Sequence, residues 1–280
     1  MNKTINVHGR LVDLSEPQVM GILNITPDSF YAGSRKQTEK EIAERAVQIV
    51  EEGGSIIDVG AFSTRPGAAQ VSQEEEMKRM RHALEIVRRE QADAVVSIDT
   101  FRPEVAKMAV EEFGAGIIND VSEGNVEGEF GGTAAIERGD DADCCPEMFR
   151  MVAHLGVPYI LMSVRGTMHD MLMAFAREVQ QLRDLGQKDI ILDPGFGFGK
   201  TMEQNYAVMS HLEQLQALDL PLLVGVSRKS MIWRLLGITA EEALNGTTVL
   251  NTIALQKGAS ILRVHDVKAC VETVKILHII

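Results

Sequence analysis

Acidic and amide side chains stand at the ends of several apolar segments in this 280-residue sequence. Asp99 lies near the end of AVVSIDT, Asp193 follows DIIL, and Asn119 is in GIIND. An aspartate in such a place can cap the following helix. A partly buried carboxylate can instead accept two parallel hydrogen bonds from the N–H and NH₂ edge of an amino-substituted heterocycle, and Asn119 adds a donor and an acceptor. These residues therefore indicate either helix caps or a binding site for a nitrogen-rich ring.

Basic side chains end the last two apolar segments. Lys229 follows PLLVGVS, and Arg263 lies in SILRVHD, two residues before His265. On a continuing strand Arg263 and His265 would point the same way. The last two loops of a parallel barrel and a helix N-terminus often bind phosphate. A lone histidine could equally be packed or cap a helix, but beside Arg263 it predicts an anion pocket.

Eight short, nearly continuous apolar segments alternate with segments of helical pattern, which is typical of strands buried on both faces of a parallel sheet. The predicted strands lie within 18–25, 55–60, 94–100, 116–120, 157–163, 189–195, 221–227 and 260–266. The predicted helices lie within 38–54, 72–90, 102–114, 146–156, 168–186, 202–217, 239–258 and 267–278. This pattern predicts an α/β protein with a (β/α)₈ TIM barrel. A doubly wound sheet is the alternative, although no G-x-G-x-x-G follows the first strand.

Two segments depart from the alternation of strands and helices. Residues 4–15 predict a short β-hairpin ahead of the barrel, covering its bottom. Residues 122–144, after the fourth strand, are rich in Gly, Asp and Glu and predict a flexible, solvated insertion, with a lid as the alternative. No linker divides the chain, so residues 1–280 are expected to form one domain. Thr38 and Glu41 form a capping-box pattern that predicts a helix start at Thr38.

The composition narrows the function classes. With a net charge of −12, the chain would repel a nucleic-acid backbone, whereas a small anion needs only a few focused cations. No stretch is long and apolar enough for a membrane span, and the N-terminus lacks the apolar part of a signal peptide. The three cysteines form no disulfide or zinc pattern, so a cytoplasmic location is expected. GFGFGKT (195–201) lacks the first glycine of a P-loop.

Seven motifs between Gly21 and Val267 resemble, in order, those of the dihydropteroate synthase family: GILNITPDSF, STRPG, SIDT, IIND, ILDPGFGFGKT, GVSRKS and LRVHDV. The resemblance implies a TIM barrel, usually homodimeric. It implies a transferase that joins 6-hydroxymethyl-7,8-dihydropterin pyrophosphate to p-aminobenzoate, giving 7,8-dihydropteroate and pyrophosphate in folate biosynthesis. The implied mechanism is SN1-like, and sulfonamides would compete with p-aminobenzoate.

The resemblance also implies residue roles. The pterin would contact Asp99, Asn119, Val121, Met162, Asp193, Gly225 and Lys229. The pyrophosphate would contact Asn24, Arg263 and His265, with Mg²⁺ at Asn24. The aminobenzoate would contact Thr64, Arg65, Pro66, Phe198 and Ser230, next to Gly225. The residues implied in catalysis are Asp99, Asp193, Lys229, Arg263 and His265, whereas Arg228 is implied to be a structural or surface residue.

Three places depart from the family pattern. Ala32 replaces an acid in the first loop, Ala61 and Phe62 replace Gly and Glu in the second, and Ser163 replaces a histidine after the fifth strand. Two alternatives therefore remain. One is a pterin-dependent methyltransferase, which shares the barrel but usually works with a corrinoid domain and lacks STRPG and SRKS. The other is a paralogue that binds pterin without turnover.

Overall fold

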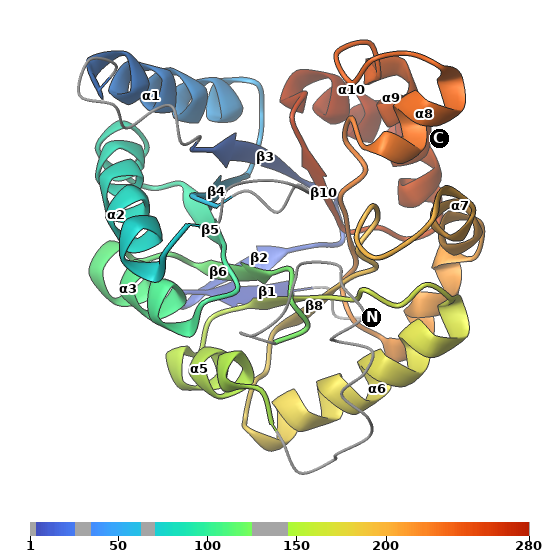
Figure 1. Cartoon of the computed structure of the whole chain (residues 1–280), viewed down its shortest axis with the longest axis horizontal. Helices are drawn as coiled ribbons and strands as arrows, with labels where there is room; N and C mark the ends of the chain where they lie inside the picture. The colour runs from blue at the N-terminus through green and yellow to red at the C-terminus, as the bar shows by residue number, and fades with distance from the viewer. Residues whose placement is uncertain (1–3, 26–34, 63–70, 125–144, 280) are drawn as a thin grey trace.

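Eight parallel strands form a nearly closed barrel in the computed structural model, which describes residues 4–25, 35–62, 71–124 and 145–279 (Figure 1). Their order is β8-β7-β6-β5-β4-β3-β10-β9, and a parallel bridge from Leu192 to Leu222 joins the two ends. This closure confirms the TIM barrel and excludes the doubly wound sheet. The strands are β3 (Gln18–Asn24), β4 (Ile56–Gly60), β5 (Val95–Asp99), β6 (Ile117–Asp120), β7 (Tyr159–Met162), β8 (Ile190–Asp193), β9 (Leu223–Val224) and β10 (Ile261–Val264).

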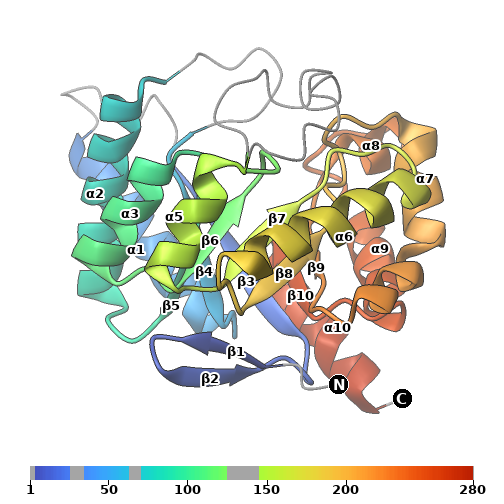
Figure 2. The same cartoon turned by 90° about the horizontal axis from the view of Figure 1, so that it is seen from below.

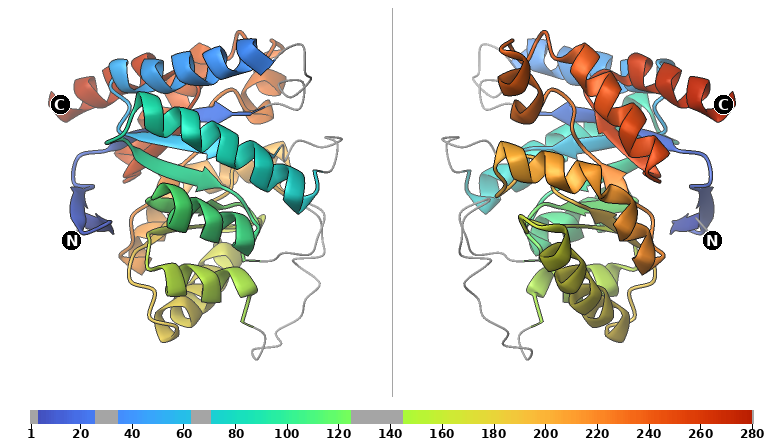
Figure 3. Two further views of the ribbon diagram at one scale, coloured as in Figure 1. Left: turned by 90° about the vertical axis from the view of Figure 1, so that its left-hand side faces the viewer. Right: turned by 90° about the vertical axis from the view of Figure 1, so that its right-hand side faces the viewer.

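Helices surround the barrel and cover the outer face of the strands (Figures 1 and 3). They are α1 (Arg35–Glu51), α2 (Gln73–Glu90), α3 (Pro103–Phe113), α5 (Glu147–Leu155), α6 (Met168–Asp184), α7 (Met202–Ser210), α8 (Ser230–Leu236), α9 (Leu244–Gln256) and α10 (Val267–Ile279). Side-chain caps fix several starts, since the hydroxyls of Ser72, Thr167 and Thr201 accept from backbone N–H groups in the first turn.

Three helix predictions need correction. Helix α1 begins at Arg35, so Thr38 lies inside the helix, buried, and does not cap it. The segment predicted as one helix at 202–217 is α7 followed by a 3₁₀ helix, η2 (Leu212–Leu218). The segment 239–258 becomes a helix only from Leu244, and a separate helix, α8, had not been predicted. Helix α8 has only seven residues, too few for its apolar periodicity to stand out.

The predicted N-terminal hairpin is confirmed as β1 (Thr4–Val7) and β2 (Arg10–Asp13), paired antiparallel. The turn residues His8 and Gly9 both have positive φ, at 51° and 82°, as a two-residue type I′ hairpin requires. Figure 2 shows the hairpin beneath the end of the barrel where the strands begin. Its side chains join the apolar cluster that fills the barrel bottom: Ile5, Val7, Leu14, Met20, Ile56, Ile117, Ile160, Ile191, Leu223 and Ile261.

One expectation from the sequence, the insertion after the fourth strand, lies mostly outside the described residues. Of the insertion predicted at 122–144, residues 125–144 lie outside them. The part that is described, Ser122 to Gly124, is held against β6, because both carboxylate oxygens of Asp120 accept from this segment, at 2.6–2.9 Å. Among the described residues, no helix combines the length and the apolar character that crossing a membrane requires.

Candidate active site

The carboxyl ends of the barrel strands bring most of the predicted site residues to one rim. Since all eight strands run parallel, their last residues lie at the same end of the barrel, opposite the hairpin (Figure 2). Asn24 ends β3, Asp99 ends β5, and Asp193 ends β8. Asn119 is the third residue of β6, and Arg263 the third of β10. The rim therefore gathers acids, amides and a guanidinium over an apolar barrel bottom.

Arg263 is the centre of a buried ion-pair network. Its Nε donates to Asp58 Oδ2 at 2.6 Å, and its Nη2 donates to Asp99 Oδ2 at 2.6 Å. The amide of Asn119 donates to the same oxygen of Asp58 at 3.2 Å. The network thus joins four strands, β4, β5, β6 and β10. Asp58 lies inside the apolar strand IIDVG, and sequence reasoning gave it no role, although an acid within a buried strand was a usable signal.

One cation cannot neutralise two buried carboxylates. Burial raises the pKa of Asp99 to about 7. The charge of Arg263 opposes this shift, whereas the nearby carboxylate of Asp58 adds to it. Burial also disfavours the guanidinium charge, but Asp58 and Asp99 outweigh it and raise the pKa of Arg263. Arg263 therefore stays charged, while Asp99 is poised close to neutral pH.

Two oxygens in this network are left open. Among the described residues, Asp58 Oδ1 and Asn119 Oδ1 are buried and have no hydrogen-bond partner. A buried oxygen without a donor costs free energy, on the order of 1–3 kcal/mol. A ligand that carries N–H groups would recover it. The two atoms therefore fit the sequence-based prediction of a site for an amino-substituted ring.

A second cluster is formed by Asp193 with two lysines. Lys229 Nζ donates to the carbonyl of Phe196 and lies 4.6 Å from the centroid of the Phe198 ring. Burial raises the pKa of Asp193, and the charges of Lys229 and Lys200 oppose that shift. Burial also lowers the pKa of Lys229 to about 8. The protonation of the Lys229 amine near neutral pH therefore depends on whether an anion lies beside it.

Lys200, from the near-P-loop GFGFGKT, holds the loop after β8. Its Nζ donates to the carbonyl oxygens of Ser163, Gly195 and Phe198 at 2.8, 3.0 and 3.2 Å. Burial lowers the pKa of Lys200 to about 7. Gly195 has φ of 66°, and a Cβ there would lie 2.2 Å from the carbonyl oxygen of Ser163. Gly195 therefore serves the close packing of two loops, in agreement with the rejection of a P-loop.

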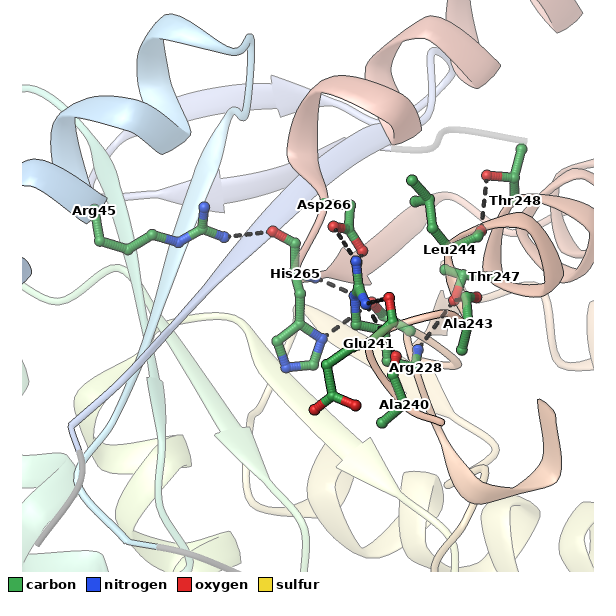
Figure 4. A network of polar contacts seen from close by, with 11 residues as sticks. Arg45, Arg228, Ala240, Glu241, Ala243, Leu244, Thr247, Thr248, His265 and Asp266 are labelled. Carbon is green, nitrogen blue, oxygen red and sulfur yellow. Dashed lines mark hydrogen bonds and ion pairs between the residues drawn. The ribbon is translucent and has the colours of Figure 1, made fainter. Parts of the chain in front are cut away.

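His265 lies just beyond β10 and is surrounded by basic residues (Figure 4). Ser227 Oγ is 3.0 Å from its Nδ1, and Arg45 Nη2 donates to its carbonyl oxygen at 2.6 Å. Burial, with the guanidinium groups of Arg263, Arg228 and Arg45, lowers the pKa of His265 to about 4, although Asp266 opposes this shift. The ring is therefore neutral near pH 7.

Arg228 has the structural role that the resemblance implied. Its guanidinium forms a two-bond ion pair with Asp266, at 2.8 Å for each bond, and donates to the carbonyls of Ala240 and Glu241 (Figure 4). Its backbone has φ of 54°, and its N–H donates to Thr247 Oγ1 at 3.0 Å. Arg228 therefore bonds Asp266 and the segment before α9, whereas its neighbour Lys229 bonds the carbonyl of Phe196 in the loop after β8.

Apolar side chains line one wall of the rim. Val121, Met162 and Val164 form a buried cluster, against which Phe198 packs. Three of these four residues had been implied in the site. Gly225 lies next to Arg263, whose Cβ is 3.7 Å from the position that a Cβ on Gly225 would take. Ser230 is the first residue of α8, while Thr64, Arg65 and Pro66 lie outside the described residues, as does Ala32.

Ser163, which departs from the family pattern, is held by an acid. Its hydroxyl donates to Glu123 Oε1 at 3.0 Å, and the N–H of Val164 donates to the same oxygen at 2.9 Å. Phe62, another departure, packs edge-on against Phe101 at 5.3 Å, with the guanidinium of Arg102 5.7 Å from its ring centroid. Ser163 and Phe62 therefore each make defined contacts with neighbouring side chains.

The donor set around Asn24 fits a Mg²⁺ ion. Gly60 lets two oxygen-bearing side chains come close, because a Cβ there would lie 3.1 Å from Asn24 Oδ1 and 3.6 Å from Asp99 Oδ2. Within the described ranges, no group of three or more His, Cys, Asp and Glu side chains is placed to hold a metal. Mg²⁺ prefers oxygen, and it commonly binds through one or two protein groups, water and substrate phosphates.

The sequence matches the family model described as pterin binding enzyme, over residues 20–265. The dihydropteroate synthase of Escherichia coli K12 is 37% identical over 284 aligned positions, covering 96% of this chain and 93% of that protein. A structure of dihydropteroate synthase from Xanthomonas albilineans with 4-aminobenzoic acid matches 100% of this chain and 98% of its own, with 33% identity and a TM-score of 0.85.

A Yersinia pestis dihydropteroate synthase, solved as a complex with a sulfonamide drug, covers 99% of this chain and 98% of its own, with 33% identity and a TM-score of 0.80. The matches span nearly the whole chain, and the curated relatives are named for one activity. Together with the barrel and its polar rim, they answer the question that the strand-end residues raised. This chain belongs to the dihydropteroate synthase family of pterin-binding enzymes, which are transferases of folate biosynthesis.

Proposed function

We propose how the described residues divide the work of the dihydropteroate synthase reaction in this chain. The reaction joins the methylene carbon of 6-hydroxymethyl-7,8-dihydropterin pyrophosphate to the amine of p-aminobenzoate and releases pyrophosphate. The observation that carries the assignment is the convergence of Arg263, Asp58, Asp99 and Asn119 on one rim with Asp193 and Lys229. A methyltransferase is not favoured, because the curated relatives are synthases.

The pterin ring is assigned to the acids and amide of the rim. Asn119 Oδ1 and Asp58 Oδ1 offer buried acceptors, and Asp99 and Asp193 offer carboxylates whose charge is costly until a donor arrives. Such groups match the amino and ring N–H groups of a pterin. Val121 and Met162 supply the apolar wall against a flat ring, and Gly225 leaves room beside Arg263. Lys229 is assigned to the ring acceptors opposite Asp193.

Bond breaking comes first in the proposed SN1-like route. The C–O bond to the diphosphate breaks, its electron pair leaves with the diphosphate oxygen, and a resonance-stabilised pterin methylene cation remains. The carboxylates of Asp58 and Asp99 stabilise that cation, since preorganised charges act strongly in a buried site. The amine nitrogen of p-aminobenzoate then forms the C–N bond, and the proton that it loses passes to the released diphosphate anion.

The leaving diphosphate is assigned to Arg263, His265 and Asn24. Arg263 uses Nε and Nη2 for its two carboxylates, so the N–H groups of Nη1 remain for an anion. His265 is neutral and contributes a hydrogen bond rather than a charge. Mg²⁺, held by Asn24 and the diphosphate, would supply positive charge that stabilises the leaving group. This positive charge would offset the repulsion between the acidic side chains of the rim and the diphosphate.

The aminobenzoate is assigned to the outer part of the site. Phe198, packed on the wall formed by Val121 and Met162, and Ser230, at the start of α8, are the described residues with this role. Thr64, Arg65 and Pro66 complete the assignment by sequence alone. The 4-aminobenzoic acid and the sulfonamide drug of the Xanthomonas and Yersinia relatives support small aromatic ligands of this kind here, in competition with each other. The cytoplasmic location and the homodimer both stay predictions. A sedimentation measurement would test the homodimer.

The decisive experiment measures pyrophosphate release by the purified chain. Release should require Mg²⁺, dihydropterin pyrophosphate and p-aminobenzoate together, and a sulfonamide should inhibit it in competition with p-aminobenzoate. Detection of 7,8-dihydropteroate by mass spectrometry confirms the C–N bond. Pterin binding in a calorimeter without any product would support the non-catalytic paralogue and contradict the proposal. Asp193→Asn should weaken pterin binding, and unaltered affinity would remove the role assigned to Asp193.

A further inference from the structure

The hydroxyl of Ser227 touches His265 at two atoms. It accepts a hydrogen bond from the backbone N–H of His265 at 3.1 Å and lies 3.0 Å from the ring nitrogen Nδ1. Ser227 is buried, with 4% of its surface exposed. Among the described residues, its hydroxyl has no other hydrogen-bond partner. The position of one proton therefore decides how this pair is arranged.

Hydrogen-bond bookkeeping selects one arrangement. A serine hydroxyl carries one proton to donate, and a backbone N–H cannot accept it. The only acceptor in reach among the described residues is Nδ1, which must then be unprotonated. With a proton on Nδ1, the hydroxyl oxygen would face two donors, and its own proton would be left without an acceptor in a buried place. Leaving a buried polar group unpaired is unfavourable.

The charges around the ring favour its neutral form. Arg45 bonds the carbonyl of His265, and Arg228 pairs with the adjacent Asp266 (Figure 4). Arg263 lies two residues earlier, on β10. Three guanidinium groups thus surround the imidazole, with Asp266 as the opposing charge. A neutral imidazole with Nδ1 unprotonated carries its proton on Nε2. Nε2 itself bonds no described residue.

We propose that Ser227 is a positioning residue that holds His265 as the neutral tautomer with its proton on Nε2. The ring then presents an N–H donor, and no additional cation, to an oxygen of the leaving diphosphate. The identity of that oxygen rests on the function proposed above, whereas the tautomer rests on the Ser227 contacts and on the charges around the ring. Arg263 supplies positive charge to the leaving diphosphate, and His265 supplies an N–H donor with a fixed orientation.

Nitrogen NMR of the purified chain, labelled with ¹⁵N-histidine and free of ligand, tests the tautomer. His265→Gln identifies the His265 signals by their loss. At pH 7 Nδ1 should resonate as an unprotonated, pyridine-like nitrogen and Nε2 as a protonated one. Ser227→Ala should move both signals towards the average of the two tautomers, and Ser227→Thr, which keeps the hydroxyl, should restore them. A protonated Nδ1 in the natural chain, or an unchanged ring in Ser227→Ala, overturns the proposal.

Pyrophosphate binding gives the second measurement. Titration with Mg²⁺ and inorganic pyrophosphate should show binding about threefold to tenfold weaker for Ser227→Ala, the value of one neutral hydrogen bond. Ser227→Thr should stay within about twofold of the natural chain. Failure of the natural chain to bind pyrophosphate, with the expected tautomer present, overturns the diphosphate assignment and supports the tautomer. If Ser227→Ala does not fold, the spectrum of the natural chain still decides.

Discussion

The bottom and the rim of this barrel are built from the same strands, yet they hold opposite kinds of side chain. On β4, Ile56 belongs to the apolar bottom and Asp58, two residues later, to the ion-pair network of the rim. Ile261 and Arg263 repeat this on β10. The same step of two separates Ile117 from Asn119 and Ile191 from Asp193. Side chains two residues apart on a strand point to the same face. On each of these four strands, one inward-facing residue therefore belongs to the apolar bottom and the next to the polar rim.

The two layers also differ in energetics. The bottom removes apolar surface from water, and each fully buried Leu or Ile there contributes about 1.5–3 kcal/mol. The rim instead keeps carboxylates, lysines and an arginine out of water, and burial shifts the pKa values of Asp99 and Lys229 towards their neutral forms. The bottom therefore contributes stability, whereas the rim holds charges that only ligands satisfy in full.

The largest effect is expected from Arg263→Met. Removing the guanidinium leaves Asp58 and Asp99 buried without their shared cation, which should lower the free energy of unfolding by roughly 3–5 kcal/mol and abolish turnover. Chemical denaturation and pyrophosphate release measure the two losses. Adding Asp58→Asn to Arg263→Met should recover part of the stability and none of the activity. A single variant as stable as the natural chain would contradict the view of the rim as an ion-pair network.

Lys229→Ala should separate activity from stability. The lost amine should reduce kcat about 10²–10³-fold, typical of a preorganised electrostatic contact. The free energy of unfolding should stay within about 1 kcal/mol, because a group whose pKa burial lowers contributes little to folding. Steady-state kinetics and denaturation check both statements. Lys40→Ala is the matched control, since the side chain of Lys40 is 72% exposed. Equal kinetics in the two variants would remove Lys229 from the site.

The bottom should behave in the reverse way. Leu14→Ala deletes a side chain that is 1% exposed in the cluster under the barrel, which should lower the free energy of unfolding by about 2–4 kcal/mol. The kcat at 25 °C should be unaltered, because the cluster contains none of the site residues. Leu11→Ala, on the same hairpin but 69% exposed, should change stability by less than about 0.5 kcal/mol. A large loss of kcat in Leu14→Ala would couple the two layers.

The smallest effect concerns pH. Burial and neighbouring cations lower the pKa of His265 from 6.5 to about 4, so between these values the unfolded chain binds a proton that the folded chain does not. The folded state should therefore lose stability as the pH falls through this window. In His265→Gln the free energy of unfolding should fall by about 1–3 kcal/mol less between pH 7 and pH 4 than in the natural chain. Denaturation midpoints from pH 7 to pH 4 give the comparison, and parallel curves would refute the shift.

Local sequence was sufficient for much of the architecture. Eight apolar segments of strand length, separated by helical segments, predicted the parallel barrel, and residues 4–15 predicted the hairpin, although only the structure located its turn at His8 and Gly9. Local signals failed at two helix starts. The capping pattern at Thr38 did not start a helix, because α1 already begins at Arg35. The start of α8, after the left-handed turn at Arg228, left too short a pattern to recognise.

The sequence by itself determined which polar residues lie near the strand ends. Apolar segments of strand length end near Asp99, Asp193 and Arg263, and parallel strands bring such ends to one rim. Only the tertiary structure decided which of them pair. Arg263 meets Asp58 across 205 positions of sequence because the closed barrel seats β10 and β4 on either side of β3. Likewise Ser227 meets His265 only because β9 and β10 are neighbours. Pairing depends on which strands lie side by side, and no local pattern carries that information.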